Sequence, residues 1–247
     1  MRTNSMASGE RTPLRSVVQF RLLGVVEAEV HGTSARLGDV LQRRLLTALL
    51  AAMGQSVCVA ELIDWIWDIA PRDPESAVRL VADSLRRDHL RPIGLGGALI
   101  DGDGTYRLEV PPEWVDLHQF RTLAERAAQL GDPEAREFLA AALQSVRGVP
   151  LADLDGRRID RYRRELAGEL RAVEIRFARI EVDRGRSQEL LPRLERLFRE
   201  FPGDMSIAEV YLAALHGADL APATLAARTR SARRARENWA DGLGAAL

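Results

Sequence analysis

Two adjacent prolines, Pro111 and Pro112, divide the 247-residue sequence into two parts with different hydrophobic patterns. Before them, short strand-like runs mix with helical segments, whereas the pattern after them is helical almost to the end. Proline lacks an amide hydrogen and disfavours helix in the residue before it, so the pair indicates an extended connection. A chain of this length fits two domains of about 100 to 150 residues. We predict a flexible N-terminus at 1–16 and domains at 17–110 and 111–247.

The first part contains signals for a small sheet, three helices and a hairpin, in that order. β-rich runs predict the strands, leucines at spacing four predict the first helix, and Pro74 suits the first turn of the third. A Gly/Asp turn between two strand-like runs is typical of a hairpin. The ranges are strands at 17–23, 25–30 and 34–37, helices at 41–53, 62–67 and 74–87, and a hairpin at 98–110. This order predicts a winged helix, in which the last two helices form a helix-turn-helix and the hairpin is the wing.

The second part contains six helical stretches separated by glycine and proline. They cover residues 116–130, 133–146, 157–184, 187–201, 204–216 and 221–239. Helix pairs of roughly 30 to 40 residues with small residues at their crossings are typical of a tetratricopeptide-like stack. The predicted class is therefore mainly α with a small β component: an N-terminal winged helix-turn-helix followed by an all-α tetratricopeptide-like helical domain.

Composition indicates an ordinary globular protein of the cytoplasm. No apolar run approaches the length of about 18 residues that a membrane span needs, and the polar start carries no secretion signal. The single cysteine, Cys58, cannot form an intramolecular disulfide, and its two valine neighbours predict a buried thiol. The chain has 35 basic residues, all arginine, against 36 acidic ones, so it lacks the basic excess that is usual for nucleic-acid binding. Any DNA-binding surface must therefore depend on local geometry.

Signals for catalysis, metal ions or cofactors are weak. The segment Asp101-Gly102-Asp103-Gly104 begins like a calcium loop, but the sixth position is Tyr106 and the twelfth is Pro112. No phosphate-binding loop of the Gly-Lys-Ser/Thr type exists in a chain without lysine. The four histidines are scattered without paired ligands. We predict no enzyme activity, no cofactor and no metal site.

The third helix has one apolar and one charged face. At about 100° per residue, Val78, Val81, Ala82 and Leu85 fall toward the core. The opposite side carries Ser76, Arg79, Asp83, Arg86 and Arg87. Arginine can bind guanine or phosphate, and Leu80 at the edge of this face can contact a thymine methyl group. Asp83 repels phosphate but can accept a hydrogen bond from a cytosine amine or orient a neighbouring arginine.

Several short stretches form a characteristic order along the chain. They are Phe20-Arg-Leu-Leu-Gly24, Leu37-Gly38, Gln42-Arg43-Arg44-Leu45-Leu46, Ala48-Leu49-Leu50, Glu61-Leu62-Ile63-Asp64-Trp65-Ile66-Trp67, Leu85-Arg86-Arg87, Tyr106-Arg107-Leu108, Val115-Asp116-Leu117 with Phe120, and Arg147-Gly148-Val149-Pro150-Leu151-Ala152-Asp153-Leu154. Taken in this order, they resemble the Streptomyces antibiotic regulatory protein (SARP) family of transcriptional activators. The resemblance implies an OmpR-like winged helix followed by a bacterial transcriptional activation domain. It also implies binding to direct repeats upstream of biosynthetic promoters, side-by-side protomers and contact with RNA polymerase holoenzyme. By position, the recognition helix is about 75–88 and the wing about 98–108.

The resemblance and the residues of the third helix together predict a sequence-specific transcriptional activator. It is expected to bind double-stranded DNA as a homodimer on repeats and to be associated with the nucleoid. Arg79, Arg86 and Arg87 are the candidates for base and phosphate contacts, with Leu80 for apolar contact and Asp83 on the same face. Arg43, Arg44 and Arg107 are candidates for support of the DNA backbone. The alternative is an interaction module for a protein or small molecule, whose winged helix has lost or weakened DNA binding. The near-neutral net charge and the acid Asp83 on the charged face of the third helix support this alternative.

Overall fold

The computed structural model of the chain describes residues 18–35, 37–218, 220, 226 and 228–230. They fall into two compact units: unit 1 is Met1–His118 with Gly148–Asp160, and unit 2 is Gln119–Arg147 with Arg161–Leu247. Unit 1 therefore extends past Pro111-Pro112 and takes in a later segment that the hydrophobic pattern does not reveal. The domain boundary at the prolines, between 17–110 and 111–247, stays a prediction. The flexible terminus predicted at 1–16 and nearly all of the helix predicted at 221–239 lie outside the described residues.

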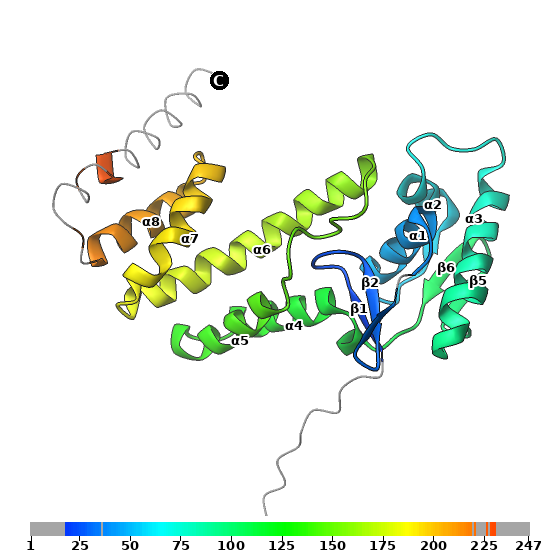
Figure 1. The fold of residues 1–247 in the computed structure, drawn as a ribbon, viewed down its shortest axis with the longest axis horizontal. Coiled ribbons are helices and arrows are strands. Elements are labelled where there is room, and N and C mark those ends of the chain that lie inside the picture. The colour runs from blue at the N-terminus through cyan, green and yellow to red at the C-terminus, as the bar shows by residue number, and fades with distance from the viewer. Residues whose placement is uncertain (1–17, 36, 219, 221–225, 227, 231–247) are drawn as a thin grey trace, which may run out of the picture. The chain divides into compact units, whose positions relative to one another are not determined.

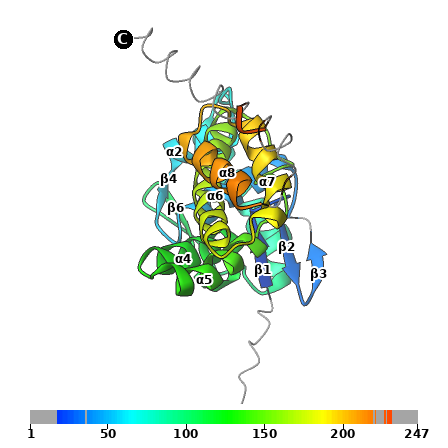
Figure 2. The ribbon, with the colours of Figure 1, turned by 90° about the vertical axis from the view of Figure 1, so that its left-hand side faces the viewer.

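Unit 1 opens with an antiparallel three-stranded sheet, as predicted. Its strands are β1 (Val18–Arg21), β2 (Glu27–Val30) and β3 (Thr33–Ala35), in that order across the sheet. They lie side by side in Figure 2. Phe20 pairs with Ala28, and both side chains are fully buried. The buried positions alternate along β1, which is the pattern of a strand with one face on the core.

Three helices follow the sheet, close to the predicted ranges: α1 (Val40–Ala51), α2 (Val59–Ile66) and α3 (Pro74–Ser84). α1 begins with a capping box, in which the Asp39 carboxylate accepts the Gln42 amide and the Gln42 side chain accepts the Asp39 amide. At the start of α3 the Asp73 carboxylate accepts from the amide of Ser76, and Pro74 takes the first helical position. α3 continues into a π-helical turn, Leu85–Leu90, and a short 3₁₀ turn, Arg91–Ile93.

The predicted hairpin is present as β5 (Leu99–Gly102) and β6 (Thr105–Leu108). Asp103 and Gly104 at its turn both have positive φ, which suits a tight two-residue connection. A third strand, β4 (Val57–Cys58), pairs with β6 and completes a sheet in the order β4-β6-β5. The prediction of a buried Cys58 thiol is wrong, because Val57 occupies the inner face of this strand and Cys58 is exposed.

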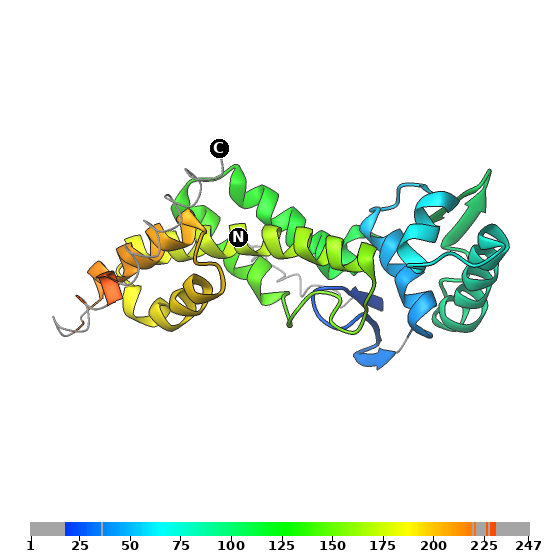
Figure 3. The ribbon, with the colours of Figure 1, turned by 90° about the horizontal axis from the view of Figure 1, so that it is seen from above.

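After a 3₁₀ turn at Pro112–Trp114, most of the residues that the structure describes are helical, as predicted. The helices are α4 (Asp116–Ala128), α5 (Asp132–Gln144), α6 (Arg157–Asp183), α7 (Ser187–Glu200) and α8 (Met205–Gly217). In unit 2, α7 and α8 pack side by side (Figures 1 and 3), and the rings of Phe198 and Tyr211 stack between them at 5.3 Å. The mainly α class with a small β component is confirmed. No helix among the described residues is both long enough and apolar enough to cross a bilayer.

Candidate nucleic-acid interface

α3 lies beside the β5–β6 hairpin in unit 1 (Figures 1 and 3), so a helix and a wing share one surface. Three of the four residues predicted for the inner face of this helix, Val78, Ala82 and Leu85, are buried, and the fourth, Val81, is partly exposed. On the outer face, Arg79 is exposed and the side chain of Leu80 is 70% exposed. An aliphatic side chain this exposed has no structural role in the core. The outer face can therefore present both a cation and an apolar contact to a ligand.

Arg86 ties the end of α3 to the wing. Its Nη1 lies 2.9 Å from Oδ1 of Asp83, and its Nη2 donates to the carbonyl of Leu99 at 3.1 Å. The same Nη2 is 3.4 Å from Oδ1 of Asp101. Because these partners occupy the guanidinium group and the side chain is only 27% exposed, Arg86 positions β5 against the helix. The helical projection places Arg86 on the charged face of the helix without revealing these contacts.

Arg87 is exposed, but its guanidinium group is held by the neighbouring acid. Nε and Nη2 of Arg87 donate to the two carboxylate oxygens of Asp88 at 2.8 and 3.0 Å. Ser84 donates to Asp88 at 3.0 Å, and Gln42 of α1 donates to Ser84 at 2.6 Å. The hydrogen bonds from Arg87, and then from Ser84, keep the pKa of Asp88 below its usual value. Asp88 is therefore ionised and oriented, and a phosphate that is to bind Nε and Nη2 of Arg87 must displace it.

Two hollows of unit 1 border α3, one near each end of the helix. The hollow at the N-terminal end has a volume of about 360 Å³, and its charged side chains are Glu75, Arg79, Asp101 and Asp103. The hollow at the C-terminal end has about 690 Å³ and is lined by Asp83, three arginines (Arg86, Arg87 and Arg91) and glycines of the segment 94–97. The first is acidic and the second is basic. Neither Arg79 nor Arg91 forms an ion pair with any residue that the structure describes.

The three arginines predicted to support the DNA backbone are engaged within unit 1. Nε of Arg43 is 3.1 Å from a carboxylate oxygen of Asp153. Arg44 donates to the carbonyl of Ile66 at 2.7 Å and pairs with Asp155. The side chains of Arg43 and Arg44 are only 14% and 11% exposed. Arg107 pairs with Glu109 at 2.6 Å and is 39% exposed. The structure thus shows that all three arginines are paired with acids, and that Arg43 and Arg44 are mostly buried.

The acids that hold Arg43 and Arg44 belong to the segment Gly148–Asp160, which we call the strap. The amides of Leu151 and Ala152 donate to the carbonyls of Leu22 and Gly24 at 3.1 and 3.0 Å. Asp153 also accepts the amide of Val26 at 2.7 Å. The strap therefore caps the chain between β1 and β2. Contacts between segments so far apart in sequence carry no periodic signal, and only the tertiary structure reveals them.

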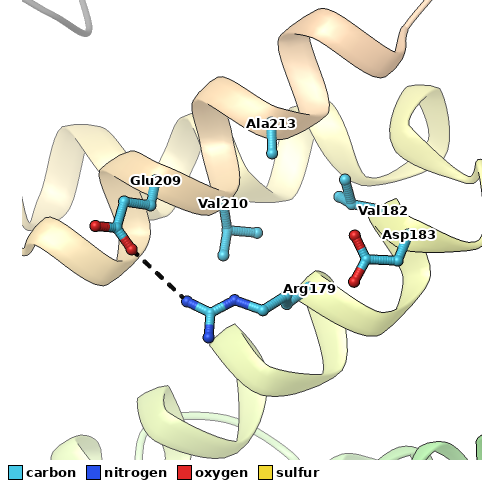
Figure 4. A pocket seen from close by; sticks show the side chains of 6 residues that line it. All are labelled: Arg179, Val182, Asp183, Glu209, Val210 and Ala213. Atoms are coloured by element: carbon cyan, nitrogen blue, oxygen red, sulfur yellow. Dashed lines mark ion pairs between the residues drawn. The ribbon is translucent and has the colours of Figure 1, made fainter. Parts of the chain in front are cut away.

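A further hollow, in unit 2, lies between α6 and α8 (Figure 4) and has a volume of about 360 Å³. Val182, Val210 and Ala213 form its apolar part, and Asp183 lies at its edge. Nη2 of Arg179 is 3.8 Å from Oε2 of Glu209 across it. This volume is at the lower end for a ligand pocket, and the charged groups partly neutralise one another. In the described part of the chain, no group of three or more His, Cys, Asp or Glu side chains could hold a metal ion.

Comparison with known proteins places the C-terminal half in a regulator family. A model of the bacterial transcriptional activator domain matches residues 115–245. The transcriptional regulatory protein MoaR1 of Mycobacterium bovis is 33% identical over 196 residues, which cover 75% of this chain and 62% of MoaR1. The regulatory protein AfsR of Streptomyces coelicolor is 32% identical over 207 residues, which cover 81% of this chain and 20% of AfsR. The chain thus spans about three fifths of the first relative and a fifth of the second.

A solved structure supports the same relationship over both units. Mycobacterium tuberculosis EmbR, solved in complex with a low affinity phosphopeptide, matches with a TM-score of 0.77 and 26% sequence identity. The match covers 92% of this chain and 61% of EmbR. The similarity therefore includes the three helices and the hairpin of unit 1 as well as the helical part.

Proposed function

We propose that this chain, which belongs to the bacterial transcriptional activator domain family, activates transcription by binding specific DNA sequences. It is a SARP-type regulator, and its relatives are transcriptional regulators. The observation that carries the proposal is the exposed side of α3 beside the hairpin, with Arg79 and Leu80 free to contact a ligand. A helix of this kind fits the major groove, where arginine reads guanine and an aliphatic group contacts thymine.

The charges of this surface indicate weak binding by one protomer. Arg86 and Arg87 are paired with acids, so Arg79 is the free cation on the outer face of α3. Phosphate contacts supply most of the affinity of proteins for DNA, and few cations are free to make them. We propose that two protomers bind adjacent direct repeats, because linked binding raises overall affinity without any new contact to DNA. The proposed interface leaves out Arg43 and Arg44, whose guanidinium groups hold the strap.

The remaining parts of the proposal come from the resemblance and the relatives. We propose that the regulated genes form a biosynthetic cluster, that the protein contacts RNA polymerase holoenzyme at the promoter, and that it works at the nucleoid in the cytoplasm. The transcriptional regulator RedD and the regulatory protein AfsR of Streptomyces coelicolor are relatives, and the chain matches 43% and 20% of their lengths.

Selection of binding sites tests the proposal directly. The purified chain is mixed with random-sequence duplexes, and the bound sequences are amplified and read. We expect a direct repeat with a spacing near one helical turn, about 10 to 11 base pairs. The expected effect of Arg79→Ala on the selected duplex is a loss of affinity of about tenfold, measured by fluorescence anisotropy.

Arg126→Ala is the matched control for that variant, since Arg126 is exposed on α4 and forms no ion pair with a described residue. We expect it to bind the selected duplex as the unmodified chain does. Failure to enrich any sequence at low salt, or equal affinity of the Arg79→Ala and Arg126→Ala variants, would contradict the proposal.

Asp88→Asn is expected to raise DNA affinity by about threefold at low salt, because an asparagine side chain no longer holds Arg87 by charge. Anisotropy with the selected duplex measures the change. Glu125→Gln on α4 is the control, since it removes one negative charge from an exposed position away from α3. If both variants gain equally, net charge alone explains the effect and the local role of Asp88 is refuted.

One observation favours the alternative of an interaction module. From Pro74 to Glu109 the chain has six acids (Glu75, Asp83, Asp88, Asp101, Asp103 and Glu109) and five arginines (Arg79, Arg86, Arg87, Arg91 and Arg107). A surface with this balance of charges is better suited to binding a protein than to attracting DNA by its overall charge. The site selection separates the two functions, because an interaction module enriches no duplex.

A further inference from the structure

The basic hollow at the C-terminal end of α3 combines side-chain cations with exposed backbone. Arg86, Arg87 and Arg91 line it together with Gly94, Gly96 and Gly97. Asp83 is the one acid in that lining, and its carboxylate is occupied by Arg86. The hollow therefore presents a net positive charge, although the region around it is balanced.

The glycine segment is shaped to approach Arg91 closely. Gly94 adopts a left-handed conformation with φ of +80°, which reverses the chain after the 3₁₀ turn. A Cβ atom at Gly96 would lie 3.1 Å from Cβ of Arg91, so a side chain there would require a shift of a few tenths of an ångström. The amides of Gly96 and Gly97 find no acceptor within the part of the chain that the structure describes. Unpaired amides next to arginines are a common way to bind an anionic oxygen.

The two hollows carry opposite charges, so the two ends of α3 interact differently with DNA. Glu75, Asp101 and Asp103 outnumber Arg79 at the N-terminal end, where phosphate is repelled. Carboxylates there can instead accept hydrogen bonds from cytosine amines at base edges. The C-terminal end holds Arg87 and Arg91 and is where a phosphate gains attraction.

We propose that this hollow binds a phosphate of the DNA backbone, with Arg91 as its principal cation, Arg87 as a second one and the amides of Gly96 and Gly97 as donors. The inference rests on the proposed function and adds to it a contact that fixes how α3 is placed along the DNA. Arg91 forms no ion pair with a described residue, whereas Nε and Nη2 of Arg87 are already paired with Asp88, whose charge opposes a phosphate nearby.

Two variants of the full chain test the site, each with a matched control. Arg91→Ala removes the cation, and Arg126→Ala on α4 removes one from an exposed position elsewhere. Gly97→Asp adds a negative charge to the hollow, and Gly97→Asn adds a neutral side chain of the same shape. A Cβ at Gly97 meets no atom within 4 Å, so both replacements fit the fold.

The expected results are measured by anisotropy over a range of salt concentrations. Arg91→Ala should weaken binding by about fivefold at low salt and reduce the slope of log K against log[salt] by about 0.9, the value for one lost phosphate contact. Gly97→Asp should bind about tenfold more weakly than Gly97→Asn because it repels the phosphate. The losses should be the same on the selected duplex and on a scrambled one, since phosphate contacts carry no sequence information.

Four results would overturn the inference. If the unmodified chain binds the selected duplex and Arg91→Ala and Gly97→Asp bind it equally well, the site is refuted and the proposed function stands. If Arg91→Ala weakens binding without changing the salt slope, or if Gly97→Asn loses as much affinity as Gly97→Asp, the hollow does not hold a phosphate. If the unmodified chain binds no duplex at any salt concentration, the proposed function fails, and the inference with it.

Discussion

Asp116→Ala is expected to lower the free energy of unfolding by about 3 kcal/mol, since it leaves three backbone donors without their charged acceptor. One carboxylate oxygen of Asp116 accepts the amides of Leu22 and Leu117 at 2.8 and 2.7 Å. The other oxygen accepts the amide of Leu23 at 3.0 Å. Leu22 and Leu23 are fully buried, so water cannot replace the lost hydrogen bonds without opening the core. Chemical denaturation followed by circular dichroism measures the loss.

Two substitutions define what the Asp116 result means. Asp116→Asn retains one carbonyl acceptor and should lose roughly half as much stability as the alanine variant. Glu125→Ala removes an acid from an exposed position on α4 and should change stability by less than about 0.5 kcal/mol. A loss below about 1 kcal/mol in Asp116→Ala would mean that the three amides are satisfied in another way.

Asp153→Ala is expected to lower the free energy of unfolding by about 2 kcal/mol and to release the strap. The carboxylate of Asp153 accepts the amide of Val26 and pairs with the mostly buried side chain of Arg43, so both lose their partner. Denaturation gives the stability, and hydrogen exchange of the amides of Leu151 and Ala152 reports the strap itself. We expect these two amides to exchange faster in the variant.

Asp155→Ala is the control within the same strap. The Asp155 side chain is 88% exposed, and Arg44 keeps its hydrogen bond to the carbonyl of Ile66 when Asp155 is removed, so we expect a loss of about 1 kcal/mol or less. Arg43→Ala tests the pair from the other side: it should lose stability as Asp153→Ala does, and the double variant should lose less than the sum. Additive losses would show that Arg43 and Asp153 do not act together. A large loss of DNA affinity in folded Arg43→Ala would instead support Arg43 as a backbone contact.

The hydrophobic pattern predicted the elements well because each is specified by its own residues. The helices predicted at 157–184 and 187–201 match α6 and α7 to within one residue at each end. Glycine and proline set those ends, since they interrupt helical hydrogen bonding locally. β4 was missed as a strand, because a run of two residues has no period and its pairing with β6 is a tertiary event.

The location of the candidate surface was predicted, but the contacts of its individual arginines were not. The charged face of α3 follows from a period of 3.6 residues, and the exposure of Arg79 and Leu80 agrees with it. The partners of Arg86 and Arg87 do not follow from that period, since Leu99 and Asp101 lie on the hairpin and Asp88 lies on a π-helical turn. Arg91 was missed because it follows the helix and faces a glycine segment whose conformation gives no periodic signal.

The sequence by itself determined the order of the elements, the amphipathic α3 and the hairpin beside it, because propensity, hydrophobic period and turn residues act over a few neighbouring positions. The tertiary structure alone decided which arginines remain free, because an ion pair depends on distances between residues that can be far apart in the chain. Arg43 and Arg44 form ion pairs with acids more than a hundred positions later in the strap, whereas Arg79 and Arg91 form no ion pair with a described residue. A charge count includes all of these arginines equally, and only their geometry separates those that hold the fold from those available to bind a ligand.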